Sequence, residues 1–207
     1  MRIAFFGGTF DPVHRGHLAI ARAAVAEFGL DEVLFVPVGR QPLKIKTAEA
    51  PFADRVEMVR LACSDSALVA KLDVSEIDAP KPGGQPNYTV DTLAELTSRR
   101  PAAELFAIAG ADSFLTMRSW REPDRLLELA RWIVASRPGF DLGEQELLAL
   151  ALTREQRARV HVLTAVHEDV SASELRRRLR ASEDCSDWVP RSVLEYIRAK
   201  GLYGTRA

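Results

Sequence analysis

The sequence alternates between short apolar runs and longer segments with helical spacing, and this alternation constrains the fold more than any other feature. Residues 2–6 (RIAFF) are typical of a buried strand. Residues 17–29 follow as an alanine-rich segment with helical spacing and a terminal glycine. Strands that alternate with helices through short connections form a parallel sheet with helices on both faces. The sequence therefore predicts an α/β fold.

The alternation continues along the chain and predicts a Rossmann-like, doubly wound parallel sheet with a C-terminal helical segment. No internal repeat, low-complexity tract or linker separates parts of the chain, so residues 1–207 are expected to form one domain, with residues 171–207 packed on it. The expected strands are 2–6, 32–38, 68–77, 104–110, 131–136 and 159–166, and the expected helices are 17–29, 53–65, 89–100, one or two within 112–130, 144–152, and two within 171–200.

Composition argues against several classes of protein. The 207 residues are 47% hydrophobic and 28% charged with a formal net charge of −1, so the overall charge attracts neither nucleic acid nor an anionic membrane. Neither Cys63 nor Cys185 has a Cys or His neighbour at metal-ligand spacing, and both are expected to be reduced thiols. MRIAFF is too short for a signal-peptide core, and no apolar run is long enough to span a bilayer. We expect a cytoplasmic protein.

The stretch GGTFDPVHRGH, residues 7–17, leaves the carboxyl end of the first expected strand. Ligands of doubly wound sheets bind beyond the carboxyl ends of the strands, where the strand order reverses. Gly7 and Gly8 allow a ligand to approach the backbone closely, and the helix that follows offers N–H donors and the positive end of its dipole. The stretch lacks the P-loop and dinucleotide-binding patterns, but it predicts a phosphate site.

Two of the four histidines, His14 and His17, lie three positions apart at the mouth of this helix. Residues three apart share a helix face, so both rings can face one ligand. A lone histidine near a helix start is more often a cap or a surface residue, but this pair follows directly on a strand and two glycines and so indicates a functional site. A metal site is the weaker interpretation because no third ligand lies nearby, and Asp11 fits a role in the turn better.

The ordered motifs of the chain resemble the nucleotidyltransferases that carry a (T/H)-x-G-H motif and, within them, the bacterial nicotinate-nucleotide adenylyltransferases. GGTFDPVHRGH is the signature of the superfamily, and the similarity covers nearly the whole chain as a single nucleotidyltransferase domain. Two positions depart from the family pattern, because Leu43 stands where a histidine is frequent and Ala172 replaces a hydroxyl residue. The other matching segments are PVGRQPLK (37–44), NYTVDTL (87–93), IAGADSFLTMRSW (108–120), VASRPG (134–139), VSASELR (170–176) and VPRSVLEYIRAKGLY (189–203).

The resemblance implies adenylyl transfer from ATP to nicotinate mononucleotide, which yields nicotinate adenine dinucleotide and pyrophosphate in NAD biosynthesis. The phosphate of the mononucleotide would attack the α-phosphorus of ATP in line. That phosphate is already nucleophilic at neutral pH, so neither a general base nor a covalent intermediate is expected. Catalysis then rests on aligning two anions and neutralising their charge. Mg²⁺ is expected to arrive with ATP, and no protein metal site is expected.

The catalytic residues implied by the resemblance are His14, His17, Lys44 and Arg176. The imidazoles can donate hydrogen bonds to phosphate oxygens, Lys44 can bring a mobile point charge, and Arg176 offers a planar fork that suits phosphate. The next basic residues are interpreted as a solvated helix face: Arg177, Arg178 and Arg180.

The implied ATP contacts come from several segments. Ser171 and Ser173 can cap their helix or bind phosphate. Asp112 can hold a ribose hydroxyl or help to position the metal, and the turn at Arg137 can approach adenine or serve the structure alone. The implied ATP-binding residues are Gly7, Gly8, Thr9, Phe10, His17, Gly110, Asp112, Arg137, Ser171, Ser173 and Arg176.

For the mononucleotide, the resemblance implies contacts from Lys44, Tyr88, Thr89 and Trp120. The backbone amides of Tyr88 and Thr89 lie at an expected helix start and can bind the nicotinate carboxylate, while Trp120 can stack on the pyridine ring. Without the resemblance, a lone tryptophan is more often a packing residue.

Several alternatives stay open at this stage. The enzyme can prefer nicotinamide mononucleotide, or it can be a related adenylyltransferase such as the pantetheine-phosphate enzyme. A nucleotide-binding sensor without turnover and an RNA-associated module are the other readings, although no basic stripe supports RNA binding. The expected partners are ATP and nicotinate mononucleotide, with no nucleic acid and no membrane, and a homo-oligomer is possible.

Overall fold

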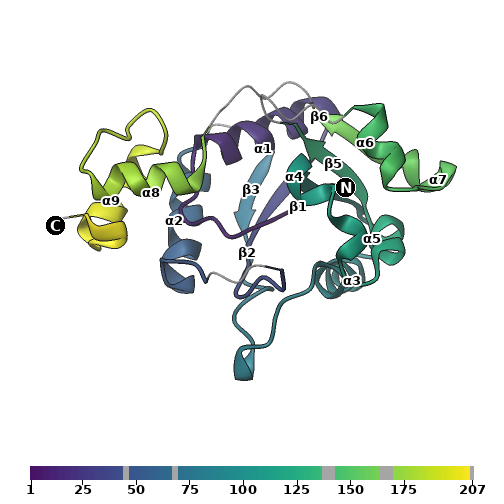
Figure 1. Cartoon of the computed structure of the whole chain (residues 1–207), viewed down its shortest axis with the longest axis horizontal. Helices are drawn as coiled ribbons and strands as arrows, with labels where there is room; N and C mark the ends of the chain where they lie inside the picture. The colour runs from purple at the N-terminus through teal and green to yellow at the C-terminus, as the bar shows by residue number, and fades with distance from the viewer. Residues whose placement is uncertain (44–46, 67–69, 137–142, 164–169, 206–207) are drawn as a thin grey trace.

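The computed structural model of the protein describes residues 1–43, 47–66, 70–136, 143–163 and 170–205. These residues form a six-stranded sheet in which every neighbouring pair is parallel, in the order β3-β2-β1-β4-β5-β6 (Figure 1). The predicted α/β, doubly wound class is confirmed. The strands are β1 (Arg2–Gly8), β2 (Glu32–Pro37), β3 (Lys71–Val74), β4 (Glu104–Gly110), β5 (Arg131–Ala135) and β6 (Val160–Leu163).

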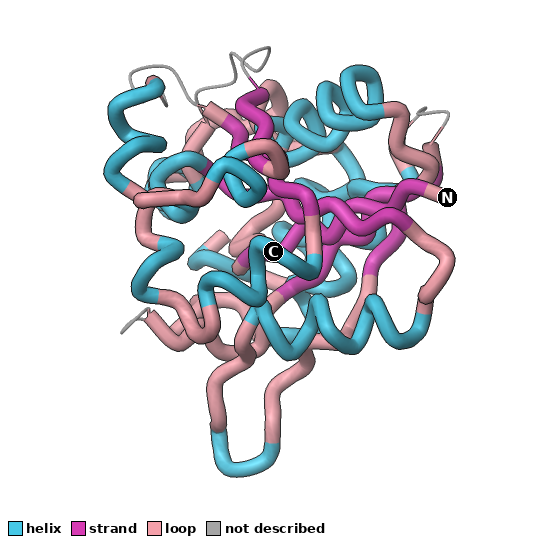
Figure 2. Tube along the Cα trace, turned by 90° about the vertical axis from the view of Figure 1, so that its right-hand side faces the viewer, coloured by secondary structure: helices cyan, strands magenta, loops and turns pink. Residues whose placement is uncertain are grey.

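The helices that the structure describes lie on both faces of this sheet, as Figure 2 shows. On one face α1, α2, α8 and α9 pack against the sheet, and on the other α3, α4, α5 and α6 do so. The bounds are α1 (Arg15–Phe28), α2 (Phe52–Ser64), α3 (Thr89–Arg99), α4 (Ala111–Phe114), α5 (Pro123–Leu129), α6 (Glu144–Ala149), α7 (Arg154–Arg157), α8 (Ala172–Arg180) and α9 (Arg191–Ala199), with 3₁₀ turns η1 (Pro82–Gly84), η2 (Met117–Ser119) and η3 (Leu202–Gly204).

The central strand β1 supplies both layers of the core because successive side chains of a strand point to opposite faces. Ile3 and Phe5 pack in the layer that contains α3 and α5. Ala4 and Phe6 pack in the layer that contains α1, α8 and α9. A strand that is buried on both faces needs a continuous apolar run, which is why RIAFF could be recognised from the sequence.

The strand order reverses beside β1, and this reversal positions the site. β1 pairs with β2, where Gly8 lies opposite Pro37, and with β4, where Phe6 lies opposite Ile108. After the edge strand β3 the chain returns through α3 to place β4 on the other side of β1. The carboxyl ends of β1 and β4 therefore flank the switch point at which such sheets bind ligands.

Several elements differ from the sequence prediction. β1 continues to Gly8. The strand predicted at 68–77 is observed as β3, Lys71–Val74, which pairs at the edge of the sheet with Glu32–Phe35 of β2, and residues 68–69 of that prediction lie outside the described residues. The α7 turn was not predicted, although Thr153 and Gln156 form a capping box that the sequence displays. The 3₁₀ turn η1 interrupts the predicted loop at 79–87.

Candidate active site

The loop after β1 is shaped by Gly8 and Phe10. A Cβ atom on Gly8 would lie 2.9 Å from the ring of Phe10, so a larger residue would displace that ring. Phe10 has a φ of 48° and is buried, with its ring edge-on to Phe6 at a centroid distance of 5.6 Å. The backbone carbonyl of Gly8 accepts a hydrogen bond from Val38 at 2.9 Å, which joins this loop to the segment after β2. Packing and this hydrogen bond thus hold the loop.

His14 and His17 are brought together at the start of α1. Their ring centroids lie 3.8 Å apart at 32°, and the backbone N–H of His14 donates to Nδ1 of His17 at 3.3 Å. Because Nδ1 of His17 accepts this hydrogen bond, the neutral ring carries its proton on Nε2, which is then a donor. His14 is buried, and His17 is half-buried with its ring 5.0 Å from that of Phe10. Packing therefore fixes the orientation of both rings.

The N-terminus of α1 is partly used by the protein itself. His14 is the N-cap residue, and α1 begins at Arg15, two positions before the predicted start at His17. The backbone N–H of Arg15 donates to the carbonyl of Trp188 at 2.8 Å, so one of the N–H groups predicted for phosphate binding instead holds the C-terminal segment.

The carboxylate of Asp11 joins the loop after β1 to two other segments of the chain. This carboxylate is buried and accepts hydrogen bonds from the backbone N–H groups of Glu49 at 2.8 Å and Ala50 at 3.0 Å. The hydroxyl of Tyr203 donates to the same carboxylate at 2.8 Å. Burial and the charge of Asp11 raise the pKa of Tyr203 far above its ordinary range, so this hydroxyl stays protonated. These contacts link Asp11 to segments that are distant in the sequence and give it a structural role.

Arg55 of α2 is a buried cation that the sequence analysis missed. It is 2% exposed, and its guanidinium donates to the carbonyls of Thr9 at 2.6 Å, Val38 at 2.9 Å and Ala50 at 3.3 Å. Burial lowers the pKa of Arg55, and the nearby charge of Asp11 opposes that shift. One side chain therefore ties the first loop to the segment after β2.

Arg176 of α8 reaches the same loop from 165 positions further along the chain. Its Nη1 donates to the carbonyl of Asp11 at 2.7 Å, its Nε donates to Glu49 Oε1 at 2.8 Å, and its Nη2 lies 3.4 Å from Ser173 Oγ. Ser171 caps α8, because its Oγ accepts a hydrogen bond from the N–H of Glu174 at 3.1 Å. Arg177 pairs with Glu174 and Glu183 and Arg178 also pairs with both, as expected for a solvated face, whereas Arg180 binds Glu49.

The end of β4 lies at the other side of the switch point. Gly110 ends this strand and caps α4, and a Cβ atom there would lie 2.7 Å from Asp112 Oδ1. Asp112 is exposed on the first turn of α4. Both predicted ATP-binding residues thus stand where the strand order reverses.

Three of the four residues predicted for the mononucleotide, Tyr88, Thr89 and Trp120, are described by the structure. Tyr88 is the N-cap of α3 and Thr89 its first residue. Trp120 packs edge-on against the core residue Trp132 at 6.0 Å, and its Nε1 donates to Thr116 Oγ1 at 3.0 Å. The guanidinium of Arg121 lies 4.8 Å from the centroid of the Tyr88 ring. Trp120 therefore packs against the core, and part of this half-buried residue remains exposed.

Asn87, which the sequence analysis did not single out, connects this group to the rest of the site. Its Oδ1 accepts a hydrogen bond from the N–H of Arg40 at 3.0 Å, and its Nδ2 donates to the carbonyl of Ala79 at 3.2 Å. Val38, two positions before Arg40, is bonded to Gly8. The chain 38–40 thus runs from the first loop to the start of α3. The motif NYT was the available signal for Asn87.

Two predicted residues, Lys44 and Arg137, lie outside the described residues. Of the two departures from the family pattern, Leu43 is exposed and Ala172 is the first residue of α8.

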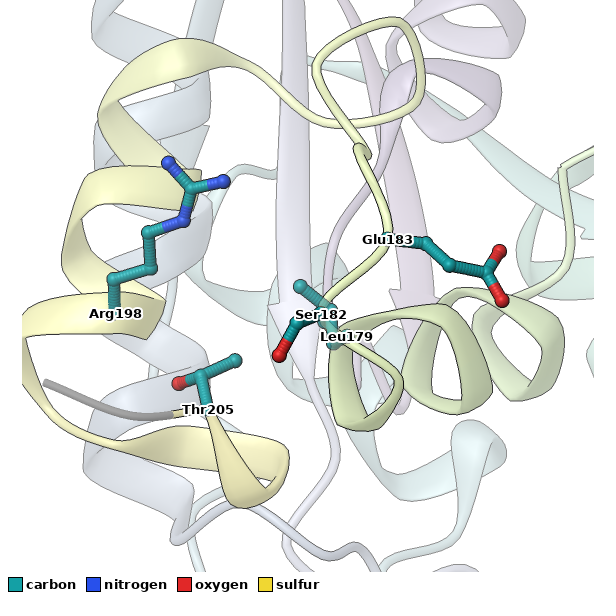
Figure 3. Close-up of a pocket in the computed structure, with 5 residues that line it drawn as sticks. All are labelled: Leu179, Ser182, Glu183, Arg198 and Thr205. Carbon is teal, nitrogen blue, oxygen red and sulfur yellow. The ribbon is translucent and has the colours of Figure 1, made fainter.

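A pocket of about 210 Å³ lies elsewhere, between α9 and the end of α8 (Figure 3). It contains none of the predicted site residues, so it is separate from the histidine loop. Its lining residues are Leu179, Ser182, Glu183, Arg198 and Thr205.

In the described part of the chain, no group of three or more His, Cys, Asp or Glu side chains could hold a metal ion. None of the helices described has the length and apolar character that a bilayer span requires. Cys63 and Cys185 are free, and burial raises the pKa of Cys63 to about 12.

Comparison with known proteins gives concordant results. The family model described as cytidylyltransferase-like matches residues 5–178. A probable nicotinate-nucleotide adenylyltransferase of Rubrobacter xylanophilus is 40% identical over 98% of this chain and 92% of its own length. One of Thermus thermophilus is 39% identical over 98% of this chain and 100% of its own length. The solved structure of the Plasmodium falciparum nicotinic acid mononucleotide adenylyltransferase complexed with NaAD has a TM-score of 0.78 at 20% identity, covering 99% and 98% of the two chains, which supports the fold.

Proposed function

Because the chain belongs to the cytidylyltransferase-like family and groups there with the nicotinate-nucleotide adenylyltransferases, we propose that it transfers the adenylyl group of ATP to nicotinate mononucleotide. The products are nicotinate adenine dinucleotide and pyrophosphate. The structural observation that carries this proposal is the convergence of His14, His17 and Arg176 on one loop at the switch point of the sheet. Imidazole and guanidinium donors at such a point suit a polyphosphate.

The reaction needs alignment more than acid–base chemistry. A phosphate monoester of the mononucleotide attacks the α-phosphorus of ATP, and the bond to the bridging oxygen of pyrophosphate breaks. Nε2 of His17 can donate to a phosphate oxygen as negative charge builds, and the fixed position of the ring means that no reorganisation is needed. Lys44 is proposed to add a mobile charge from the second loop.

The mononucleotide is proposed to bind between the start of α3 and Trp120. Backbone N–H groups at Tyr88 and Thr89 favour a carboxylate because they lie at the positive end of the helix dipole. The guanidinium of Arg121 above the Tyr88 ring adds positive charge at this place. Both features favour the acid over the amide as the substrate.

Mg²⁺ enters this scheme as part of the substrate. The ion is proposed to arrive bound to the phosphates of ATP. Asp112 is the carboxylate at the switch point that could contact the hydrated ion or a ribose hydroxyl.

The remaining proposals concern the whole chain. We treat residues 1–207 as one nucleotidyltransferase domain with residues 171–207 packed on it, acting in the cytoplasm without nucleic acid or membrane partners. A homo-oligomer is compatible with this function but is not required by it, because all of the residues proposed to bind the substrates belong to one chain.

The decisive experiment is a steady-state assay of pyrophosphate release with ATP, Mg²⁺ and either mononucleotide. We expect turnover with both ATP and nicotinate mononucleotide present, and a higher kcat/KM for the acid than for nicotinamide mononucleotide. A higher kcat/KM for the amide would contradict the assignment of the substrate. Binding of ATP without any pyrophosphate release would identify a nucleotide sensor instead.

A further inference from the structure

The carboxylate of Glu49 bridges two arginines of α8 at the edge of the first loop. Its Oε1 accepts a hydrogen bond from Arg176 Nε at 2.8 Å, and its Oε2 accepts one from Arg180 Nη2. The backbone N–H of Glu49 donates to Asp11 Oδ2 at 2.8 Å, which holds this residue beside the loop. An anionic group of this chain therefore lies between the two guanidinium groups.

The carboxylate of Glu49 is ionised at neutral pH. Burial by itself would raise the pKa of Glu49, but the hydrogen bonds from Arg180 and Arg176 outweigh it and lower the pKa below its ordinary value. A planar carboxylate that accepts from two guanidinium groups resembles two oxygens of a phosphate. The pair of arginines thus already binds an anion of the right geometry.

The ion pair between Glu49 and Arg180 is exposed enough for another anion to replace the Glu49 carboxylate. The side chains of Glu49 and Arg180 are 41% and 50% exposed, and ion pairs with such exposure contribute little to stability. Arg176 is only 19% exposed and keeps its separate hydrogen bond to the carbonyl of Asp11. If the carboxylate leaves, Arg176 therefore stays in place while Arg180 becomes available to another anion.

We propose, on the basis of the function proposed above, that Arg176 and Arg180 together bind a phosphate group of ATP and that Glu49 occupies this two-arginine site until the nucleotide displaces it. Arg180 thereby joins the ATP-binding residues, although its sequence position indicated a solvated face. Glu49 acts as an internal competitor that weakens ATP binding and helps to expel pyrophosphate after transfer. Arg177, on the same helix, has no such role because it pairs with Glu174 and Glu183.

The test is equilibrium binding of MgATP, and separately of inorganic pyrophosphate, to the full chain by isothermal titration calorimetry at constant ionic strength. Glu49→Gln should bind both ligands about five- to tenfold more tightly, because the competitor loses its charge. Arg180→Gln should bind them about five- to tenfold more weakly. The matched control Arg177→Gln should stay within about twofold of the parent protein.

The double variant Glu49→Gln with Arg180→Gln separates competition from a general charge effect. Competition at one site predicts that the gain from Glu49→Gln is mostly lost when Arg180 is absent, so the two effects are not additive. Weaker binding by Glu49→Gln would overturn the proposal, since Glu49 would then position Arg176. Equal losses in Arg180→Gln and Arg177→Gln would overturn it as well. Pyrophosphate release by the parent protein tests the proposed function independently, because it does not depend on either substitution.

Discussion

Replacing Arg55 by methionine tests whether one buried side chain holds the loop after β1 and the segment after β2 together. Methionine keeps an unbranched apolar side chain but removes every donor. The carbonyls of Thr9, Val38 and Ala50 would then lose the hydrogen bonds that they now accept at 2.6, 2.9 and 3.3 Å. The carboxylate of Asp11 would also lose the electrostatic attraction of the buried Arg55 guanidinium.

The expected loss of stability follows from these contacts. A buried carbonyl left without a donor costs about 1–3 kcal/mol, but removing the guanidinium also removes its desolvation cost. Breaking a buried charged network of this kind typically costs about 3–5 kcal/mol in the free energy of unfolding. For a domain of this size each kcal/mol lowers the Tm by about 2–4 °C, so the Tm should fall by roughly 6–20 °C.

The control is Arg60→Met on the same helix. The Arg60 side chain is 51% exposed, and its ion-pair partners among the described residues are the surface residues Glu57 and Glu76. The Tm of this variant should therefore fall by less than about 4 °C. Calorimetric melting measures the Tm, and pyrophosphate release well below the melting range gives kcat/KM per folded molecule.

Because a small displacement of a substrate loop is costly to catalysis, Arg55→Met should also lower kcat/KM by at least about tenfold. The reasoning would be refuted by a Tm decrease no larger than that of Arg60→Met. It would be refuted in its functional part by a lower Tm together with an unchanged kcat/KM per folded molecule.

Three further substitutions probe the same site. His17→Ala should lower kcat by at least about 100-fold with a Tm change of only a few degrees, and a sharp fall in Tm with unchanged specific activity would show a structural residue instead. Tyr203→Phe removes a donor from the buried Asp11 carboxylate and should lower the free energy of unfolding in urea by about 1–3 kcal/mol, so an unchanged midpoint would argue against that bond. Asp78→Asn tests pH dependence: burial raises the pKa of Asp78 although Thr92 donates to its carboxylate, so the folded state favours the neutral acid. The stability that Asp78 contributes is lost as the pH rises above about 4. Between about pH 3 and 7 the variant should therefore gain stability relative to the parent. A difference in the free energy of unfolding that stays constant over this range would contradict this reasoning.

The strands of the sheet were predictable because each inner strand is buried on both faces and needs a continuous apolar run. β4 was predicted to the residue, and β5 to within one residue, by this signal. The edge strand β3 was predicted to extend beyond its observed end at Val74. The residues that follow form a turn instead, in which the backbone N–H of Ile77 donates to Ser75 Oγ. Apolar character reports burial, and at a sheet edge burial does not require strand pairing.

The site was only half visible in the sequence. The pairing of His14 with His17 follows from spacing within one turn, whereas Arg55 and Glu49 act through contacts that no local pattern encodes. The sequence does contain one indication that Arg55 is buried, because Arg55 shares the helical spacing of the buried residues Met58, Val59 and Ala62 on one face of α2. A charged residue at a core position of an amphipathic helix is a signal of a buried hydrogen-bond network.

The geometry of the first loop depends on the two ends of the chain. The Asp11 carboxylate accepts from Tyr203, which lies 192 positions later, and the Asp11 carbonyl accepts from Arg176. Contacts between such distant positions require closure of a long loop, whose entropy cost only the complete fold offsets. The C-terminal segments α8 and η3 therefore complete the proposed phosphate site, because they supply both the fork of Arg176 and the hydroxyl that donates to Asp11. The motif after β1 predicts the chemistry, and the packing of α8 and η3 against the same core layer fixes the position of the loop.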